Sequence, residues 1–285
     1  MTIADIQKTY WDELSKVYDA REARSITKIV FEKILELNTP KLSLERFRIL
    51  TTNQQEELDK VLTRLVAQEP VQYVLEEADF MGLIFKVNKH VLIPRPETEE
   101  LVDWINHELR ITDYQLRILD IGTGSGCIPI SIAKEFPSLI VEATDVSEEA
   151  LLVAEENNRT HGTTVNFYKH DILHENLLPK TYDLIVSNPP YIAEREKTEM
   201  APNVLDYEPH LALFAADEDD LIFYRRIAAQ AMHALNPGGK LFFEINQARG
   251  NEVMELMKAN GFLNLELRKD MSGRDRMVKG EKALL

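Results

Sequence analysis

From residue 117 onward, short apolar runs of strand length alternate with stretches of helical periodicity. The strand-like runs lie at 118–121, 139–143, 165–168, 184–186 and 241–245, and the helical stretches lie at 126–135, 147–159 and 219–235. This alternation predicts an α/β domain with a mostly parallel sheet covered by helices on both faces. In such a fold the loops at the carboxyl ends of the strands bind the ligand.

A glycine-rich loop, LDIGTGSGC at 119–127, follows the first of these runs. Gly122, Gly124 and Gly126 permit positive φ angles and let the backbone pass close to a ligand. A dinucleotide-binding loop would place its third glycine where this chain has Cys127, and the Gly-Lys-Ser/Thr of a P-loop is missing. The loop therefore favours a nucleoside without phosphates. S-adenosylmethionine is such a nucleoside, and it carries a positive sulfonium.

Three aspartates follow successive strand-like runs and fit the parts of S-adenosylmethionine. We expect Asp120 to face the methionine ammonium, Asp145 to accept hydrogen bonds from both ribose hydroxyls, and Asp171 to meet the adenine amino group. Asp145 or Asp171 could instead cap the next helix, but the order of the aspartates after a glycine loop favours the cofactor. We expect His170 to be a surface or strand-end residue rather than a catalyst.

The fourth strand-like run ends in Asn188-Pro189-Pro190-Tyr191. The prolines lack N–H donors and fix φ, which leaves backbone carbonyls pointing outward. A substrate NH2 group can donate one hydrogen to the Asn188 side-chain oxygen and the other to a carbonyl, which we assign to Pro189. Tyr191 supplies an aromatic face over a planar group. A plain turn is the alternative, and the position after a glycine loop disfavours it.

This arrangement suits a planar amide or aniline-type nitrogen, whose lone pair is delocalised and poorly nucleophilic. Two acceptors hold the nitrogen so that its lone pair turns toward the sulfonium methyl, and they stabilise the positive charge that develops during attack. No strong base is required, because the methylated nitrogen is acidic. We predict Asn188, Pro189 and Tyr191 as catalytic residues, with Pro190 beside them in substrate binding.

Helical periodicity dominates residues 1–75. Apolar residues recur at spacings of three and four, Pro40 is expected to stop the second helix, and Asn53 with Glu56 resembles a capping box. An added helical module of this kind usually recognises a partner. From 79 to 91 the pattern changes to that of a β-hairpin between two domains.

The chain resembles the HemK/PrmC methyltransferases, which modify the glutamine of the Gly-Gly-Gln tripeptide in class I peptide chain release factors. The resemblance spans essentially the whole chain. The segment Pro94-Arg95-Pro96-Glu97-Thr98-Glu99 separates this family from most other Asn-Pro-Pro-Tyr enzymes. The other segments that carry the resemblance are 80–85, 92–93, 120–126, 145–147, 188–192, 207–209, 212–213, 237–239 and 243–245.

The resemblance implies a seven-stranded, Rossmann-like class I methyltransferase fold, with S-adenosylmethionine as donor and S-adenosylhomocysteine as product. It implies a helical release-factor-recognition domain at 1–75, a β-hairpin linker at 76–93 and a methyltransferase domain at 94–285. Asn188 and the Pro189 carbonyl would hold the glutamine amide, and Arg95 would shape the substrate pocket. The predicted cofactor-binding residues are Asp120, Gly122, Thr123, Gly124, Gly126, Asp145, Val146, Asp171, Ile172 and Asn188.

Two positions depart from the family pattern. After Ala212-Leu213 the family often has a glycine-rich turn, whereas this chain continues with an acidic run at 217–220. Asn246 stands where a glycine is expected after Ile245. Both departures concern local loop geometry rather than the reaction.

Composition bears on partners and compartment. The chain has 48 acidic residues against 33 lysines and arginines, a formal net charge of −15 that repels a phosphate backbone. Its single cysteine excludes an internal disulfide and a cysteine-based zinc cluster. There is no apolar run of membrane-spanning length and no signal-peptide core. We expect a cytoplasmic monomer with no metal site, no membrane association and no stable nucleic-acid binding.

Two alternatives stay open. An adenine-N6 methyltransferase acting on DNA or RNA would present the same NH2 group to Asn188, but it would have to flip a base and hold a phosphate backbone. A binding module that keeps the cofactor but has lost catalysis is the second, and the intact Asn188 and Tyr191 disfavour it. The prediction is a release factor glutamine methyltransferase that modulates translation termination.

Overall fold

The structure is a computed structural model that describes residues 1–284 except 111–114, 178 and 216–218. Its residues form two compact units, Met1–Glu77 with Ala201–Tyr207 and Ala78–Met200 with Glu208–Leu285. The segment 201–207 groups with the N-terminal helices although the residues on both sides of it belong to the second unit. The predicted division at 1–75, 76–93 and 94–285 stays a prediction.

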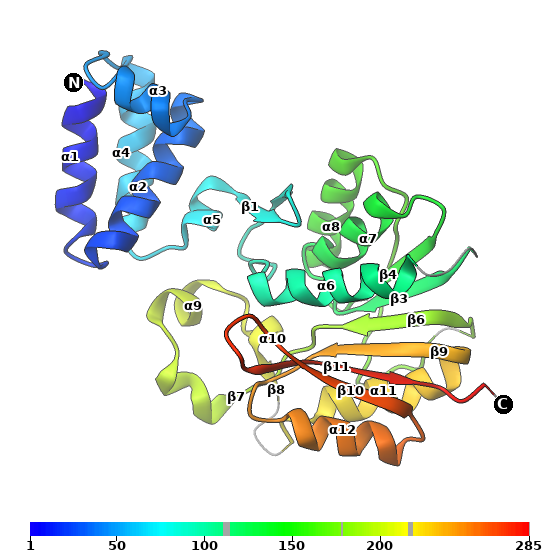
Figure 1. Cartoon of the computed structure of the whole chain (residues 1–285). Helices are drawn as coiled ribbons and strands as arrows, with labels where there is room; N and C mark the ends of the chain where they lie inside the picture. The colour runs from blue at the N-terminus through cyan, green and yellow to red at the C-terminus, as the bar shows by residue number, and fades with distance from the viewer. Residues whose placement is uncertain (111–114, 178, 216–218, 285) are drawn as a thin grey trace. The chain divides into compact units, whose positions relative to one another are not determined.

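The first unit is a helical bundle with one apolar core (Figure 1). Tyr10 lies at its centre, where its ring meets Phe31 edge-on at 5.1 Å and its hydroxyl donates to the Leu58 carbonyl. The helices of this unit are α1 (Ile3–Leu14), α2 (Ala20–Leu35), α3 (Thr39–Leu44), α4 (Thr52–Val66), α5 (Val71–Leu75) and α9 (Pro202–Tyr207).

Two details of these helices differ from the sequence prediction. Pro40 lies in the first turn of α3 instead of stopping α2, because a first-turn residue needs no N–H donor. The capping box of α4 pairs Thr51 with Gln54 rather than Asn53 with Glu56. Both patterns satisfy the sequence rule, and the extended backbone at Thr51 selects the first.

A seven-stranded sheet organises the second unit, in the order β10-β11-β9-β6-β3-β4-β5. Strands β3, β4, β5, β6 and β9 run parallel, and β11 pairs antiparallel with both β9 and β10. The predicted α/β fold with seven strands is confirmed. The strands are β3 (Arg117–Ile121), β4 (Ile140–Asp145), β5 (Asn166–Lys169), β6 (Tyr182–Ser187), β9 (Leu235–Glu244), β10 (Leu263–Lys269) and β11 (Asp275–Glu281).

Successive residues of the central strands pack on opposite faces of this sheet. Leu184 and Val186 of β6 enter one apolar cluster with α6 and α7, whereas Ile185 enters the other with α11 and α12. Figure 1 shows α6, α7 and α8 on one side of the sheet and α11 and α12 on the other. These helices are α6 (Pro96–Leu109), α7 (Cys127–Glu135), α8 (Glu148–His161), α11 (Ile222–Ala234) and α12 (Gly250–Ala259).

Short elements complete the chain. The predicted hairpin forms from β1 (Glu77–Phe80) and β2 (Leu83–Lys86), and Phe80 and Phe85 of this hairpin belong to the same cluster as α6. The Asn157 side chain of α8 bonds both the N–H and the carbonyl of Lys86. The remaining elements are β7 (Ile192–Ala193), η1 (Glu194–Glu199), α10 (His210–Leu213) and β8 (Phe214–Ala215). Within the described part of the chain, we find no helix with the length and apolar character needed to cross a bilayer.

Candidate active site

A cavity of about 310 Å³ opens at the carboxyl ends of β3, β4, β5 and β6. This is the edge at which a parallel α/β sheet binds ligands. Most of the predicted site residues line it: Gly122, Thr123, Gly124, Asp145, Val146, Asp171, Ile172, Asn188, Pro189, Pro190 and Arg95. Asp120, Gly126 and Tyr191 lie outside the lining, and each has a different structural setting.

The glycine loop has left-handed backbone at Gly122, Gly124 and Gly126, with φ of 79°, 54° and 79°. Gly126 is also required by space, because an added Cβ would lie 2.8 Å from Ile130 Cδ1. This residue is the N-cap of α7 and allows the helix to pack closely against Ala154 of α8, so it supports the loop from outside the cavity lining. The loop is joined to β4 by bonds from the N–H groups of Gly122 and Thr123 to the Thr144 carbonyl.

Asp145 ends β4 and lies in the cavity wall. Its two carboxylate oxygens accept the N–H groups of Gly124 and Ser147 at 2.8 and 2.9 Å. Burial raises the pKa of Asp145, although these backbone hydrogen bonds oppose the shift. A carboxylate oxygen has more than one lone pair, so both can still accept the hydroxyls of a ribose.

Buried polar atoms without partners surround the loop. Within the described residues, both carboxyl oxygens of Asp120 and the hydroxyls of Thr123 and Ser125 have no hydrogen-bond partner. Burial raises the pKa of Asp120 to about 7, the neighbouring Thr123 hydroxyl opposes the shift, and the nearby Asp145 carboxylate adds to it. Buried polar groups in native proteins are nearly always paired. Thr123 and Ser125 line the cavity, so their hydroxyls are placed to meet a polar ligand, whereas Asp120 is fully buried outside the lining.

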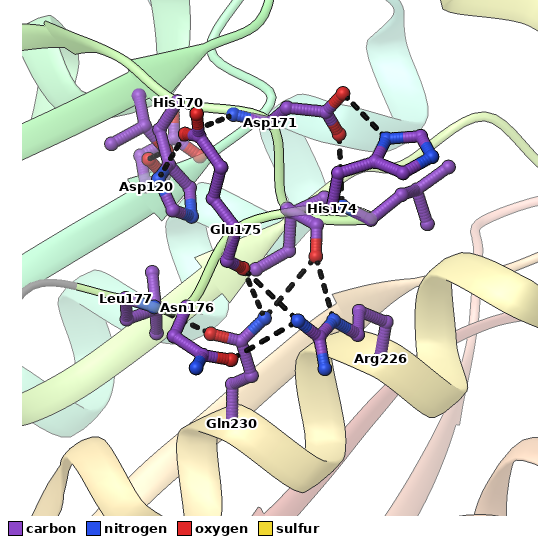
Figure 2. Close-up of polar contacts among 12 residues, drawn as sticks. Asp120, His170, Asp171, His174, Glu175, Asn176, Leu177, Arg226 and Gln230 are labelled. Carbon is purple, nitrogen blue, oxygen red and sulfur yellow. Dashed lines mark hydrogen bonds and ion pairs between the residues drawn. The ribbon is translucent and has the colours of Figure 1, made fainter.

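The segment after β5 forms another wall of the cavity, and Figure 2 shows how α11 holds it. Arg226 and Gln230 both donate to the Ile172 and Glu175 carbonyls. Burial disfavours the charged form of Asp171, but hydrogen bonds from His174 and the Leu173 N–H outweigh it and lower the pKa of this carboxyl. Asp171 is thus kept ionised as an acceptor.

His170 differs from its sequence prediction in one respect. It follows β5 directly, as expected of a strand-end residue, but it lines the cavity and only 9% of its side chain is exposed. Its Nδ1 lies 3.2 Å from the Glu175 carboxylate, and its buried Nε2 has no hydrogen-bond partner among the described residues (Figure 2).

Asn188 lines the cavity and turns its amide nitrogen toward Thr98. Its Nδ2 donates to the Thr98 hydroxyl over 3.2 Å. The preceding residue, Ser187, is held in place by its hydroxyl, which donates to the Ile121 carbonyl over 2.6 Å. In the described part of the chain, no group donates to Asn188 Oδ1 or to the Pro189 carbonyl. Both residues line the cavity, and the role of these two oxygens as acceptors of a substrate amide stays a prediction.

Tyr191 packs behind the motif, beside the apolar cluster that includes Tyr224 and Phe243. Its hydroxyl donates to Glu244 over 3.4 Å, and burial raises the pKa of the phenol. The expected aromatic cover over the substrate is thus not a feature of the cavity lining, and that role stays a prediction. Asn246, one of the two departures from the family pattern, donates to the Tyr191 carbonyl.

Arg95 is held at the cavity rim by a buried acid. Its guanidinium lies 2.6 Å from Glu208, whose side chain is 1% exposed and which also accepts the Ile93 N–H. The acidic run at 217–220 was the other departure, and its residues 217 and 218 lie outside the described part of the chain.

Three residues that the sequence analysis assigned no role now support the site: Thr98, Glu208 and Glu244. Each lies in a segment that carries the family resemblance, and this was the sequence feature that could have indicated a role in the site. Which side chain each would meet could not be read from the sequence, because Thr98 and Glu244 are 146 residues apart.

Comparison with known proteins agrees with this geometry. Residues 10–75 match the family model described as PrmC N-terminal domain, and residues 98–207 match the Methyltransferase small domain. A release factor glutamine methyltransferase of Flavobacterium psychrophilum is 45% identical over 281 residues, which cover 98% of this chain and 99% of the relative. The chain belongs to the release factor glutamine methyltransferase family. The predicted family is confirmed.

Other relatives of the release factor glutamine methyltransferase family are similar over nearly the whole chain. The one from Bacteroides thetaiotaomicron is 44% identical, covering 93% of this chain and 95% of its own. The solved catalytic domain of hMettl16, in complex with MAT2A 3'UTR hairpin 1, is 14% identical with a TM-score of 0.58, over 90% and 89% of the two chains, and shows the shared fold. The predicted enzyme class, a methyltransferase with S-adenosylmethionine as donor, is confirmed.

Proposed function

We propose that this protein methylates the side-chain amide nitrogen of the glutamine in the Gly-Gly-Gln motif of class I peptide chain release factors, and thereby modulates translation termination. The observation that carries the proposal is the orientation of Asn188. Its Nδ2 is engaged by Thr98, so its Oδ1 is the atom left for a substrate amide. A glutamine side chain carries the two N–H donors that Asn188 Oδ1 and the Pro189 carbonyl can accept.

The cofactor pocket is proposed to bind S-adenosylmethionine through residues that already have the required chemistry. Asp120 would face the ammonium, Asp145 the ribose hydroxyls, and Asp171 and Ile172 the adenine. Thr123 and Val146 would complete the wall beside the glycine loop. When bound, S-adenosylmethionine supplies a methyl group activated by a positive sulfonium.

The residues around Asn188 are proposed to act by positioning and by charge. The two carbonyl oxygens fix the amide plane and turn the nitrogen lone pair toward the methyl group. As the nitrogen–carbon bond forms and the carbon–sulfur bond breaks, positive charge passes from sulfur to nitrogen, where the same oxygens would stabilise it. That charge makes the nitrogen acidic, and its proton can pass to water. Pro190, Tyr191 and Arg95 are proposed to shape the substrate side of the pocket.

The partner and setting are proposed on composition and family. The helical residues 1–75 would recognise the release factor, with 76–93 as linker and 94–285 as the methyltransferase domain. The net charge of −15 disfavours stable nucleic-acid binding. We propose that the protein works in the cytoplasm as a monomer.

The test is peptide mass spectrometry of a release factor incubated with the protein and S-adenosylmethionine. We expect the mass of one methyl group on the Gly-Gly-Gln glutamine, and none with Asn188→Ala. Calorimetry should show that this variant still binds S-adenosylmethionine, which separates loss of catalysis from loss of the fold. An unmodified release factor together with label on added DNA or RNA would overturn the proposal in favour of the adenine alternative.

A further inference from the structure

Three side chains form a hydrogen-bonded series behind the Asn-Pro-Pro-Tyr motif. Asn188 Nδ2 donates to Thr98 Oγ1 over 3.2 Å, and Thr98 Oγ1 donates to Glu244 Oε2 over 2.6 Å. Thr98 and Glu244 are 3% and 1% exposed, so water has little access to the bond between them. They come from the first turn of α6 and the last residue of β9, two rigid elements of the same unit.

The direction of these hydrogen bonds follows from the chemistry of the groups. An ionised carboxylate can only accept, so the single hydroxyl hydrogen of Thr98 is committed to Glu244. Only lone pairs of the Thr98 oxygen then face Asn188. The Asn188 amide must present its NH2 group there, because its carbonyl oxygen would meet another acceptor.

A second contact fixes the acid at the end of the series. The Tyr191 hydroxyl reaches Glu244 Oε1 at 3.4 Å, and the Tyr224 hydroxyl donates to the Glu244 main-chain carbonyl. The Glu244 side chain is thus held between α6 and the motif itself. A threonine hydroxyl without a second partner could donate or accept, so either end of the Asn188 amide could face it; the bond from Thr98 to Glu244 removes that freedom.

We infer that Thr98 and Glu244 are positioning residues that fix the Asn188 amide with Oδ1 toward the substrate. The inference rests on the proposed function, in which Oδ1 accepts a hydrogen from the glutamine amide. The inference assigns Thr98, which lies in the Pro94–Glu99 segment, a role in orienting Asn188 for the reaction. Neither residue touches the transferred methyl group, so neither is a catalytic residue.

The test compares Thr98→Val, which keeps the shape and removes the hydroxyl, with Thr98→Ser, which keeps the hydroxyl. Assays at about pH 8 keep Glu244 ionised, because burial raises its pKa to about 7. We expect Thr98→Val to lower kcat by about tenfold to a hundredfold, the range for one lost orienting hydrogen bond. We expect Thr98→Ser to stay within about threefold of the wild type, and both variants to bind S-adenosylmethionine as the wild type does.

A second readout does not depend on the release factor. With asparagine labelled by 15N, the Asn188 side-chain signal is assigned as the one that Asn188→Ala removes. We expect hydrogen exchange of its NH2 group to accelerate in Thr98→Val and not in Thr98→Ser. If Thr98→Val does not fold, Thr98→Ala takes its place.

The inference is overturned if Thr98→Val keeps its kcat within about threefold, or if Thr98→Ser loses as much as Thr98→Val. The second result would mean that the threonine methyl group matters for packing and the hydroxyl does not. Failure of the proposed function has a different signature, since the wild type itself would then leave the release factor unmodified while the exchange result stands.

Discussion

The backbone N–H of Gly124 donates to Asp145 Oδ2 over 2.8 Å, and this bond joins the glycine loop to the end of β4. The same carboxylate accepts the Ser147 N–H at the start of α8. One side chain therefore shapes the loop and lies in the wall of the cavity. The cofactor pocket and its loop depend on each other through Asp145.

Asp145→Ala should weaken S-adenosylmethionine binding by about tenfold to a hundredfold, because hydrogen bonds to a charged group contribute about 1.5–3 kcal/mol. The loss combines the ribose contacts with the freed glycine loop. Isothermal calorimetry measures the affinity directly. Glu148→Ala is the matched control, since Glu148 is exposed and bonds to Lys169. Equal affinities for wild type and Asp145→Ala would remove Asp145 from the cofactor site.

Gly126→Ala should destabilise the second unit by roughly 2–4 kcal/mol. A left-handed alanine costs about 1–2 kcal/mol, and forcing Ile130 and Ala154 apart adds a comparable amount. Gly162→Ala is the control, because Gly162 has φ of +63° but nothing within 4 Å of the added Cβ. Urea denaturation should show the control losing only the backbone part. If both variants lose the same stability, the close packing at Gly126 has no energetic weight.

The glycine loop and the Asn-Pro-Pro-Tyr motif could be placed from sequence because each is a continuous segment after a buried strand. Thr98 and Asn188 are 90 residues apart, and their contact depends on where α6 crosses the end of the sheet. No local pattern encodes that crossing. The same holds for Tyr191. The motif predicts that Tyr191 follows β6 near the site, but it does not predict the direction in which the ring points.

Most strands of the sheet were predictable because they hold runs of buried apolar residues, as β3, β4, β6 and β9 do. Apolar runs also predicted β5, whose residues are exposed or half-buried, but they predicted neither β10 nor β11. Most residues of β10 are exposed or half-buried, because it is an edge strand. Charged residues such as Glu266 and Arg268 alternate along it, as edge strands often require. Because charged residues interrupt its apolar residues, β10 contains no apolar run of the kind that predicted the other strands.

Stability should depend on pH through Glu244. Burial raises the pKa of Glu244 from 4.5 to about 7, although its hydrogen bond from Thr98 and the charge of Arg276 oppose the shift. The folded state thus binds this proton more tightly than the unfolded state does. The contribution of Glu244 to the free energy of unfolding falls by on the order of 3 kcal/mol as pH rises from about 4.5 to about 7. Above that interval it is constant.

The comparison of wild type with Glu244→Gln isolates this contribution, because other titrating groups cancel in the difference. Trp104 lies in the core of the second unit, so a Trp11→Phe background lets its fluorescence report that unit alone in urea denaturation. The wild type should lose stability relative to Glu244→Gln across the interval and not beyond it. Parallel pH profiles would show that Glu244 ionises as freely in the fold as in water.

The ion pair of Arg95 with Glu208 should stabilise the cavity rim. Arg95→Gln leaves a buried carboxylate without its cation, and we expect a loss of about 2 kcal/mol. This is less than the loss for a fully enclosed pair, because about a third of the Arg95 side chain is exposed. Arg110→Gln breaks an exposed pair with Glu135 and should cost about 0.5 kcal/mol or less.

A double-mutant cycle with Glu208→Gln separates the pair from the individual residues. If the two residues act through each other, Arg95→Gln should cost little once Glu208 is already neutral. Urea denaturation of the four proteins provides the coupling energy, and methyl transfer measured on the same proteins tests the role of Arg95 at the substrate. Additive losses in stability would mean that Arg95 and Glu208 contribute independently. A change in the KM of the Arg95→Gln variant would then report the role of Arg95 in substrate binding.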